Sequence, residues 1–150
     1  MRMGLVGLGK MGANMRERLR SGGIEVTGYD RNPEVTDVPS LAALVASLPV
    51  GERIVWVMAA AVIDELAGLL TVGDLVIDGG NSHFTEDGAH AAQLAAHGIG
   101  YVDAGVSGGV WGRVNGYGLM VGGTADHVAL AMEVFDVLRP EGPRAEGFVH

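Results

Sequence analysis

Apolar residues follow two alternating patterns along the chain. Short apolar runs, typical of buried strands, occupy residues 3–7, 24–29, 53–58, 74–78, 99–103 and 118–121. The segments between them have apolar residues at helical spacing and predict helices after the first strand as far as Gly22, over 40–48, 61–70 and 85–97, and from Thr124 to Pro140. Such alternation predicts an α/β domain with a doubly wound, mostly parallel sheet and helices on both faces.

The connection after the second strand is unusually short. Only residues 34–39 separate Pro33 from the next helix, whereas a parallel crossover normally needs a dozen or more residues. We therefore expect residues 35–38 to form a short strand without a helix before it. Residues 148–150 could begin one more strand. With 150 residues, 48% of them hydrophobic, the whole chain is expected to form one domain.

The first strand passes directly into the first helix through Gly7, Gly9 and Gly12. This G-x-G-x-x-G spacing is typical of the Rossmann-like turn that binds the pyrophosphate of a dinucleotide. The first glycine permits a tight turn, the second lets the backbone approach phosphate, and the third lets the helix pack closely on the strand. The free amides and the dipole of the helix then attract the anion. The predicted cofactor-binding turn comprises Gly7, Leu8, Gly9, Lys10, Met11 and Gly12.

The second strand ends at Asp30, where this fold places the carboxylate that accepts hydrogen bonds from the ribose hydroxyls of NAD. Arg31 follows directly, and its guanidinium could instead pair with the extra phosphate of NADP. NAD is favoured, with NADP as the alternative. Met58, at the end of the strand over residues 53–58, is expected to face the same cofactor.

Two later loops carry further candidate chemistry. The segment DGGNS follows the carboxyl end of a strand, where open parallel sheets bind ligands. Its Asn81 can donate and accept hydrogen bonds, so it could hold a nicotinamide ribose or a substrate hydroxyl, although a simple helix-entry turn is the alternative. The segment GVSGGVWG offers the hydroxyl of Ser107 and the bare amides of Gly108 and Gly109 to an anionic ligand, or else is a flexible linker.

Composition excludes several classes of function. The formal charge of −8 and a single lysine, Lys10, argue against a nucleic-acid partner. The absence of cysteine excludes disulfides and thiolate metal sites and favours a reducing compartment. We see no apolar run long enough for a membrane span and no secretory signal, so a cytoplasmic protein is expected.

Two other kinds of site are disfavoured. Ser107 lies in a G-x-S-x-G pattern, but a nucleophile elbow needs a helix directly after the serine, and the glycines that follow predict none. His127 or His150 could only nominally complete a triad. His90 and His97 are expected on one helix face, solvated and too far apart for one metal ion, so no metal site is predicted.

The motifs GLGKMGANM, YDRNP, VWVM, IDGGNS, YVDAGVSGGVWG and GYGLMVGG together resemble the coenzyme domain of 6-phosphogluconate dehydrogenases. The resemblance covers nearly the whole chain. GLGxMG and SGGxxG are shared with the wider β-hydroxyacid dehydrogenases and imine reductases, whereas DGGNS with SGGVWG and GYxLMxGG is more specific to the 6-phosphogluconate branch. A family helix after YDRNP and a loop after WVM are nearly absent here.

The resemblance implies specific roles for these residues. It makes Gly7, Gly9 and Gly12 the pyrophosphate loop, and it makes Asp30 and Arg31 the pair that selects the ribose. Asn81 would lie between nicotinamide and substrate, and the catalytic candidates in this chain are Asn81 and Ser107. The substrate-binding residues would be Asn81, Ser107, Gly108 and Gly109.

The implied reaction is oxidation of 6-phosphogluconate by NAD, or by NADP, and decarboxylation to ribulose 5-phosphate in the pentose phosphate pathway. The family's Lys base and Glu acid belong to a helical domain beyond residue 150, through which the full-length enzymes pair as homo-oligomers. Residues 1–150 alone are thus expected to bind dinucleotide without turnover. The alternatives are a non-catalytic dinucleotide-binding module, or a related β-hydroxyacid dehydrogenase or imine reductase.

Overall fold

The computed structural model describes residues 1–80 and 84–150. The strands are β1 (Arg2–Val6), β2 (Glu25–Tyr29), β3 (Ile54–Val57), β4 (Leu75–Asp78), β5 (Gly100–Ser107), β6 (Gly118–Gly123) and β7 (Phe148–Val149). The α-helices are α1 (Lys10–Ser21), α2 (Leu41–Ala46), α3 (Ile63–Leu69), α4 (Phe84–Ala95), α5 (Gly112–Asn115), α6 (Ala125–Leu130) and α7 (Met132–Leu138). Three 3₁₀ turns complete the described part: η1 (Ala60–Val62), η2 (Gly109–Trp111) and η3 (Arg144–Glu146).

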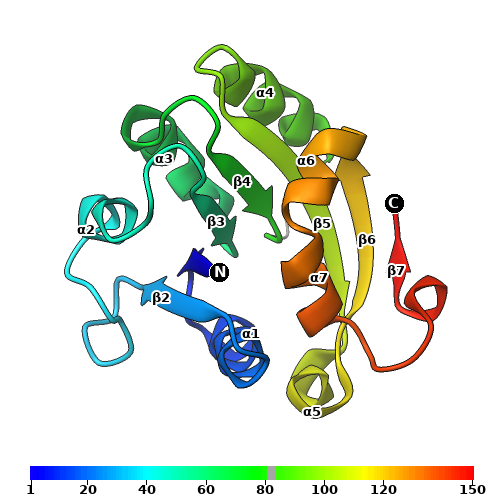
Figure 1. Cartoon of the computed structure of the whole chain (residues 1–150). Coiled ribbons are helices and arrows are strands. Elements are labelled where there is room, and N and C mark those ends of the chain that lie inside the picture. Colours follow the sequence, from blue (N-terminus) through cyan, green and yellow to red (C-terminus); the bar gives the residue numbers. More distant parts are fainter. Residues whose placement is uncertain (81–83) are drawn as a thin grey trace.

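The described strands form one sheet in the order β2-β1-β3-β4-β5-β6-β7. All neighbouring pairs are parallel except β5 and β6, which are antiparallel. Helices α1, α6 and α7 cover one face, and α2, α3 and α4 cover the other (Figure 1). The predicted fold, a doubly wound and mostly parallel Rossmann-like sheet, is therefore confirmed.

The central strand β3 shows why the apolar runs form strands. All four of its residues are buried, because alternate side chains enter opposite helix layers. Ile54 and Trp56 pack in the core beside α1 and α7, whereas Val55 and Val57 pack in the core beside α2 and α3. The ring of Trp56 meets that of Phe135 edge to face at 6.1 Å. Both faces of the sheet are thus held by separate apolar cores.

The connection after β2 forms turns, so the strand expected over residues 35–38 is wrong. The backbone N–H of Asp37 donates to the Gly28 carbonyl at 2.9 Å, and its carboxylate accepts the Gly28 N–H at 2.7 Å. One residue therefore satisfies the outward backbone groups of β2 at this point, and no further strand is needed. Thr36 Oγ1 accepts the Asp30 N–H at 3.1 Å, which ties this segment to the end of β2.

The helix expected from Thr124 to Pro140 is divided at Ala131, whose φ of −99° and ψ of 6° depart from the helical values. Thr124 caps α6 as expected, because its hydroxyl oxygen accepts the His127 N–H at 3.2 Å. The apolar stripe along α6 and α7 still faces the core, and Phe135 on α7 is fully buried. In the described part of the chain, the helices are too short or too polar to cross a bilayer.

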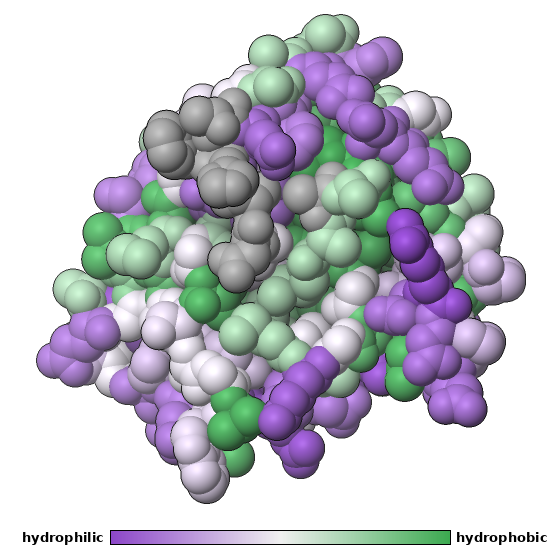
Figure 2. All heavy atoms as spheres, turned by 180° about the vertical axis from the view of Figure 1, so that it is seen from behind, coloured by the Kyte–Doolittle hydropathy of each residue, from purple (hydrophilic) through white to green (hydrophobic). Residues whose placement is uncertain are grey.

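Apolar side chains also reach the surface. Seen from behind, the centre of the molecule is covered mainly by apolar and weakly polar residues, and hydrophilic residues gather toward its margins (Figure 2). Trp111 is 70% exposed, and Val110 and Val114 beside it are at least half exposed. The segment that follows β5 therefore presents apolar surface, of the kind that marks binding or docking sites.

Candidate functional site

In the turn between β1 and α1, each of the three positions is occupied by glycine for a different physical reason. Gly7 has a φ of 93°, a conformation that favours glycine, and donates its N–H to the Tyr29 carbonyl at 2.9 Å. A methyl group on Gly12 would overlap the carbonyl oxygen of Gly7, so helix and strand could not approach so closely. Around Gly9, a methyl group would meet none of the described atoms within 4 Å. The site therefore has open space at the second glycine, where a phosphate would approach.

The first turn of α1 points free backbone donors into that space. Gly9, the N-cap residue, has no side chain that could accept hydrogen bonds from these N–H groups. The first turn also contains no acidic residue. The Gly9 carbonyl accepts the Ala13 N–H at 2.8 Å, so the helix proper starts at this point. The N–H groups before Ala13 and the positive end of the helix dipole make this turn a site for an anion.

Asp30 is fixed at the end of β2 by the same turn. Its carboxylate accepts the Leu8 N–H at 2.7 Å and the Asn32 N–H at 2.8 Å. These hydrogen bonds, from Asn32 and then Leu8, hold the pKa of Asp30 below its usual range, and the nearby Arg31 charge acts in the same direction. Asp30 is therefore an oriented, ionised acceptor beside the glycine turn.

A cavity of about 340 Å³ extends from this carboxylate to the start of α3. Its lining residues are Val6, Gly7, Tyr29, Asp30, Arg31, Ala59, Ala61, Val62 and Glu65. It lies at the carboxyl ends of β1 and β2, where doubly wound sheets bind their ligands. The sequence predicted Gly7, Asp30 and Arg31 as cofactor-binding residues, and all three line this cavity. It did not predict the lining residues from η1 and α3, because no motif marks them.

Met58, the cofactor-binding candidate that follows directly after β3, lies against the glycine turn. Its backbone N–H donates to the Val6 carbonyl at 2.8 Å, and a methyl group on Gly7 would be 3.0 Å from its Cβ. Its sulfur accepts the Trp56 indole N–H at 3.2 Å, so this side chain supports the turn from below. Asn81 lies outside the described residues.

The loop after β5 differs from the expectation that its glycines exclude a helix. Ser107 ends β5, Gly108 turns the chain with a φ of 157°, and η2 and α5 follow at once. Gly112 has helical angles that any residue could adopt, but a side chain there would overlap the ring of Tyr117, so packing requires glycine at this position. Ser107 and Gly109 are exposed, and in the described part nothing lies within 4 Å of a methyl group built on Gly109. The backbone of this loop is accessible to a ligand.

The structure brings the two glycine-rich segments together. A cavity of about 130 Å³ lies between the start of α1 and the loop after β5, lined by Lys10, Met11, Asn14, Gly109 and Val110. Residues 100 positions apart in sequence thus face the same space. Sequence reasoning missed Asn14, although it lies four residues after Lys10 and so on the same face of the helix.

Arg18 on α1 helps to hold this arrangement. Its guanidinium donates to the backbone carbonyl oxygens of Arg113, Val114, Val137, Leu138 and Arg139 at 2.9 to 3.2 Å. These carbonyls belong to the ends of α5 and α7, where helices leave acceptors unpaired. A single side chain therefore fixes α5, and with it the preceding loop, against the helix that begins at the glycine turn.

The geometry excludes a serine-hydrolase triad from the candidates. His127 packs against Gly100 at the opposite end of β5 from Ser107, seven residues away, which corresponds to about 23 Å in an extended strand. His150 Nε2 lies 3.0 Å from the Gly123 carbonyl oxygen, to which its N–H can donate, near that same distant end. Neither imidazole can reach the Ser107 hydroxyl, so the helix after Ser107 does not create a nucleophile elbow.

A cluster of polar side chains, two of them acidic, lies between α4 and strands β4 and β5. The Tyr101 hydroxyl is 3.1 Å from a carboxylate oxygen of Asp78, whose other oxygen accepts the Gly80 N–H at 3.0 Å. Asp78, Asp87 and His90 each place one possible metal ligand within 4.8 Å of the others. His97 is exposed, as expected, but it lies beyond the end of α4, and His90 is half-buried with its Nδ1 shielded from solvent. The expectation that both histidines are solvated on one helix face is therefore wrong for His90 and for the shared helix. The hydrogen bonds already made by Asp78 reduce its capacity to bind a metal ion.

Burial, followed by the charges of Asp87 and Asp78, raises the pKa of Asp103 from 3.8. A carboxyl group with a raised pKa stabilises the fold below its unfolded pKa, and this contribution is lost as pH rises through its folded pKa. Asp103→Asn should therefore raise the free energy of unfolding at neutral pH, by up to about 1 kcal/mol because solvent screens the group.

Urea unfolding at pH 7 and at pH 4 measures the effect, and the gain is expected to shrink at the lower pH. Glu141→Gln, at an exposed position, is the control and should change stability little at either pH. An equal gain for Asp103→Asn at both pH values would contradict this assignment.

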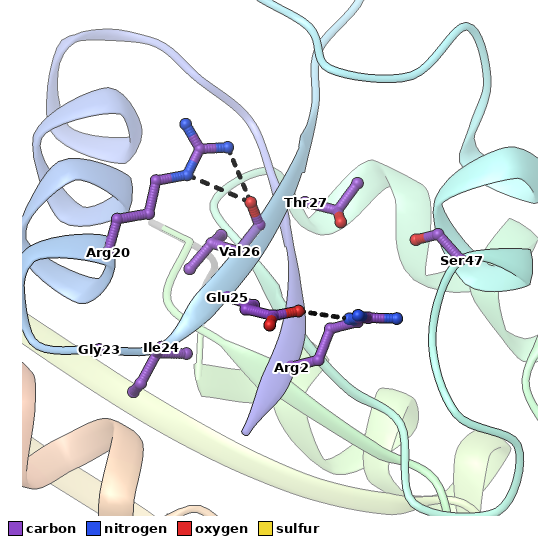
Figure 3. A pocket seen from close by; sticks show the side chains of 8 residues that line it. All are labelled: Arg2, Arg20, Gly23, Ile24, Glu25, Val26, Thr27 and Ser47. Carbon is purple, nitrogen blue, oxygen red and sulfur yellow. Dashed lines mark hydrogen bonds and ion pairs between the residues drawn. The ribbon is translucent and has the colours of Figure 1, made fainter.

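Another hollow, of about 580 Å³, lies along β2 (Figure 3). Its charged side chains are occupied: Arg2 pairs with Glu25 at 2.8 Å, and Arg20 donates to the Val26 carbonyl at 2.7 Å. Arg2 and Glu25 begin β1 and β2, so this hollow extends to the amino ends of the strands. Ligands of open parallel sheets bind at the opposite ends, and the two cavities beside the glycine turn are therefore taken as the candidate site.

A doubly wound sheet whose first helix opens on a glycine turn of this geometry defines the class of dinucleotide-binding dehydrogenase domains. The family follows from comparison with known sequences. A family model described as the NAD binding domain of 6-phosphogluconate dehydrogenase matches residues 2–139. The chain belongs to this family.

Named relatives cover most of this chain but are longer. The decarboxylating 6-phosphogluconate dehydrogenase of Synechococcus elongatus is 41% identical in an alignment that covers 81% of this chain and 30% of that protein. The NAD(+)-dependent, decarboxylating enzyme of Haloferax volcanii is 35% identical in an alignment that covers 98% of this chain and 52% of that protein. The chain therefore spans about a third to a half of the length of these relatives.

Solved structures give the same fold. The 3-hydroxyisobutyrate dehydrogenase of Mycobacterium tuberculosis, determined with L-serine, has a TM-score of 0.84 at 26% identity, over 99% of this chain and 53% of that one. The 6-phosphogluconate dehydrogenase of Plasmodium falciparum, described with NADP+ and with 6-phosphogluconate, has a TM-score of 0.80 at 25% identity, over 90% and 33%.

Proposed function

We propose that this chain provides the coenzyme site and part of the substrate site of an enzyme that oxidises and decarboxylates 6-phosphogluconate to ribulose 5-phosphate. The observation that carries the proposal is the cavity shared by the start of α1 and the loop after β5. A dinucleotide on the glycine turn and an anionic sugar acid on the loop would meet there. The decarboxylating relatives support this substrate.

In this proposal the cofactor extends across both cavities. The backbone donors from Gly9 to Gly12 would bind the pyrophosphate, and Asp30 with Arg31 would bind the adenosine ribose. The Leu8 N–H is already held by the Asp30 carboxylate, so Leu8 would contribute by fixing that ribose acceptor. Nicotinamide would lie toward the other cavity, and the family resemblance assigns Asn81 to its contacts. A bound nicotinamide would supply the hydride acceptor for oxidation at the third carbon of the sugar acid.

The substrate would meet the loop after β5. The hydroxyl of Ser107 and the amides of Gly108 and Gly109 offer hydrogen-bond donors to its carboxylate or hydroxyl groups. Orientation of the sugar acid against the nicotinamide is the task that these groups can perform. Proton transfer requires a base and an acid, for which the family uses a Lys and a Glu in its helical domain.

Lys10 does not replace that base in this proposal, because it belongs to the phosphate-binding turn at the start of α1. Measured alone, the 150 residues are therefore expected to bind dinucleotide without oxidising 6-phosphogluconate. Calorimetry with NAD+ and NADP+ tests binding, and the absorbance of reduced nicotinamide tests turnover. Turnover by the purified chain would contradict the assignment of proton transfer to another domain; failure to bind either dinucleotide would contradict the coenzyme site.

Asp30→Ala tests the choice of cofactor. NAD+ binding is expected to weaken about tenfold, since a hydrogen bond to a charged acceptor is lost, and NADP+ binding should weaken less. Calorimetric titration of both dinucleotides measures this. Asp30→Asn, which keeps an acceptor for the Leu8 N–H, distinguishes lost charge from a distorted turn. The reverse ranking of the two dinucleotides would mean that Arg31 decides the preference.

A further inference from the structure

We infer that Glu65, on the first turn of α3, is a specificity-determining residue that disfavours NADP. It lines the 340 Å³ cavity together with Asp30 and Arg31. This inference rests on the proposed function, in which that cavity receives the adenosine ribose. No motif of the sequence points to Glu65, and only the packing of α3 brings it there.

The charges that line this cavity carry the inference. Among the described residues of the lining, Asp30 and Glu65 are acidic and Arg31 alone is basic, so these side chains present a net negative charge to a ligand. The 2′-phosphate of NADP adds a charge of about −1.5 to −2, as phosphate monoesters do near neutral pH. The attraction of Arg31 for that phosphate is offset by two carboxylates rather than by one. The uncharged 2′-hydroxyl of NAD does not meet this repulsion.

The short connection after β3 explains how Glu65 reaches the cavity. Strand β3 ends at Val57, η1 follows over Ala60–Val62, and α3 begins at Ile63. The first turn of α3 is thereby held at the carboxyl ends of β1 and β2. The residues missing here, relative to the family pattern after WVM, would otherwise lengthen this connection.

Helix α3 offers a matched control for the role of Glu65. Acidic residues in the first turn of a helix are favourable because of the helix dipole, and this explanation applies equally to Asp64 and Glu65. Both residues are exposed, but only Glu65 is among the residues that line the cavity. Asp64→Asn therefore removes the same charge from the same helix turn without changing the cavity wall.

The test is calorimetric binding of NAD+ and NADP+ at low salt to the full 150-residue chain. Glu65→Gln is expected to strengthen NADP+ binding about fivefold, the range of a partly exposed charge interaction, and to change NAD+ binding less than about twofold. Asp64→Asn should leave the ratio of the two affinities unchanged. The gain should shrink at high salt, which screens charges but would not reverse a merely structural change.

A second variant identifies the partner of the phosphate. Adding Arg31→Gln to Glu65→Gln should remove the gain in NADP+ affinity, because the guanidinium is then absent. An unchanged affinity ratio in Glu65→Gln, or the same change in Asp64→Asn, overturns the inference while NAD+ binding by the unaltered chain still supports the proposed function. If the unaltered chain binds neither dinucleotide, the proposed function fails and the inference fails with it.

Discussion

Gly12→Ala is expected to lower the free energy of unfolding by about 3 kcal/mol and the thermal midpoint by about 10 °C. Within an exposed helix, replacing glycine by alanine normally stabilises by about 1 kcal/mol. The sign reverses at Gly12 because the added methyl group would overlap the Gly7 carbonyl oxygen, which is backbone and cannot rotate away. Helix α1 must then move off β1, and the geometry of the glycine turn is lost with it.

Urea unfolding followed by circular dichroism measures this change. The matched control is Gly68→Ala in α3, an exposed helical glycine around which, in the described part of the chain, no atom lies within 4 Å of an added methyl group. This control should gain about 0.5–1 kcal/mol. If Gly12→Ala were as stable as Gly68→Ala, the close packing of helix on strand would not be what requires glycine there.

Gly9→Ala is expected to weaken NAD+ binding about 10- to 100-fold while changing the free energy of unfolding by less than about 1 kcal/mol. The backbone angles of Gly9, φ −63° and ψ −170°, are accessible to alanine. Its added methyl group would meet no described atom of the protein, so folding is nearly unaffected. That same space is where the pyrophosphate would approach the free amides of α1.

Calorimetry with NAD+ tests the second prediction, and a melting curve on the same sample shows that the fold is intact. Gly122→Ala in β6 is the control, because its surroundings in the described structure are equally open and it lies outside both candidate cavities. It should bind NAD+ normally. Normal binding by Gly9→Ala would mean that the ligand does not occupy the turn.

Local patterns were enough to predict most of the strands and helices and the glycine turn. The apolar run that forms β3 and the stripe of Met15 and Leu19 on α1 report burial directly, because strand and helix have fixed side-chain periods. The predictions failed at two places for different reasons. Asp37 satisfies the N–H and carbonyl of Gly28 by itself, so no strand is needed there. Gly108 turns the chain sharply with its positive φ, and this turn allows a helix to follow despite the glycines.

Contacts between distant segments were beyond those patterns. The antiparallel pairing of β5 with β6, the hydrogen bonds of Arg18 to α5 and α7, and the burial of His90 Nδ1 depend on how helices cover the sheet. Residues on separate elements meet only after both apolar faces are buried. No periodicity or motif in the sequence predicts these contacts.

The sequence by itself determined that a tight glycine turn opens the first helix, since Gly7, Gly9 and Gly12 act through local backbone geometry. Only the tertiary structure decided what lies around that turn. It placed Gly109 beside Lys10 in one cavity and Glu65 beside Asp30 in the other. The physical reason is that the sheet, by aligning the carboxyl ends of its parallel strands, brings together loops that are far apart in the chain.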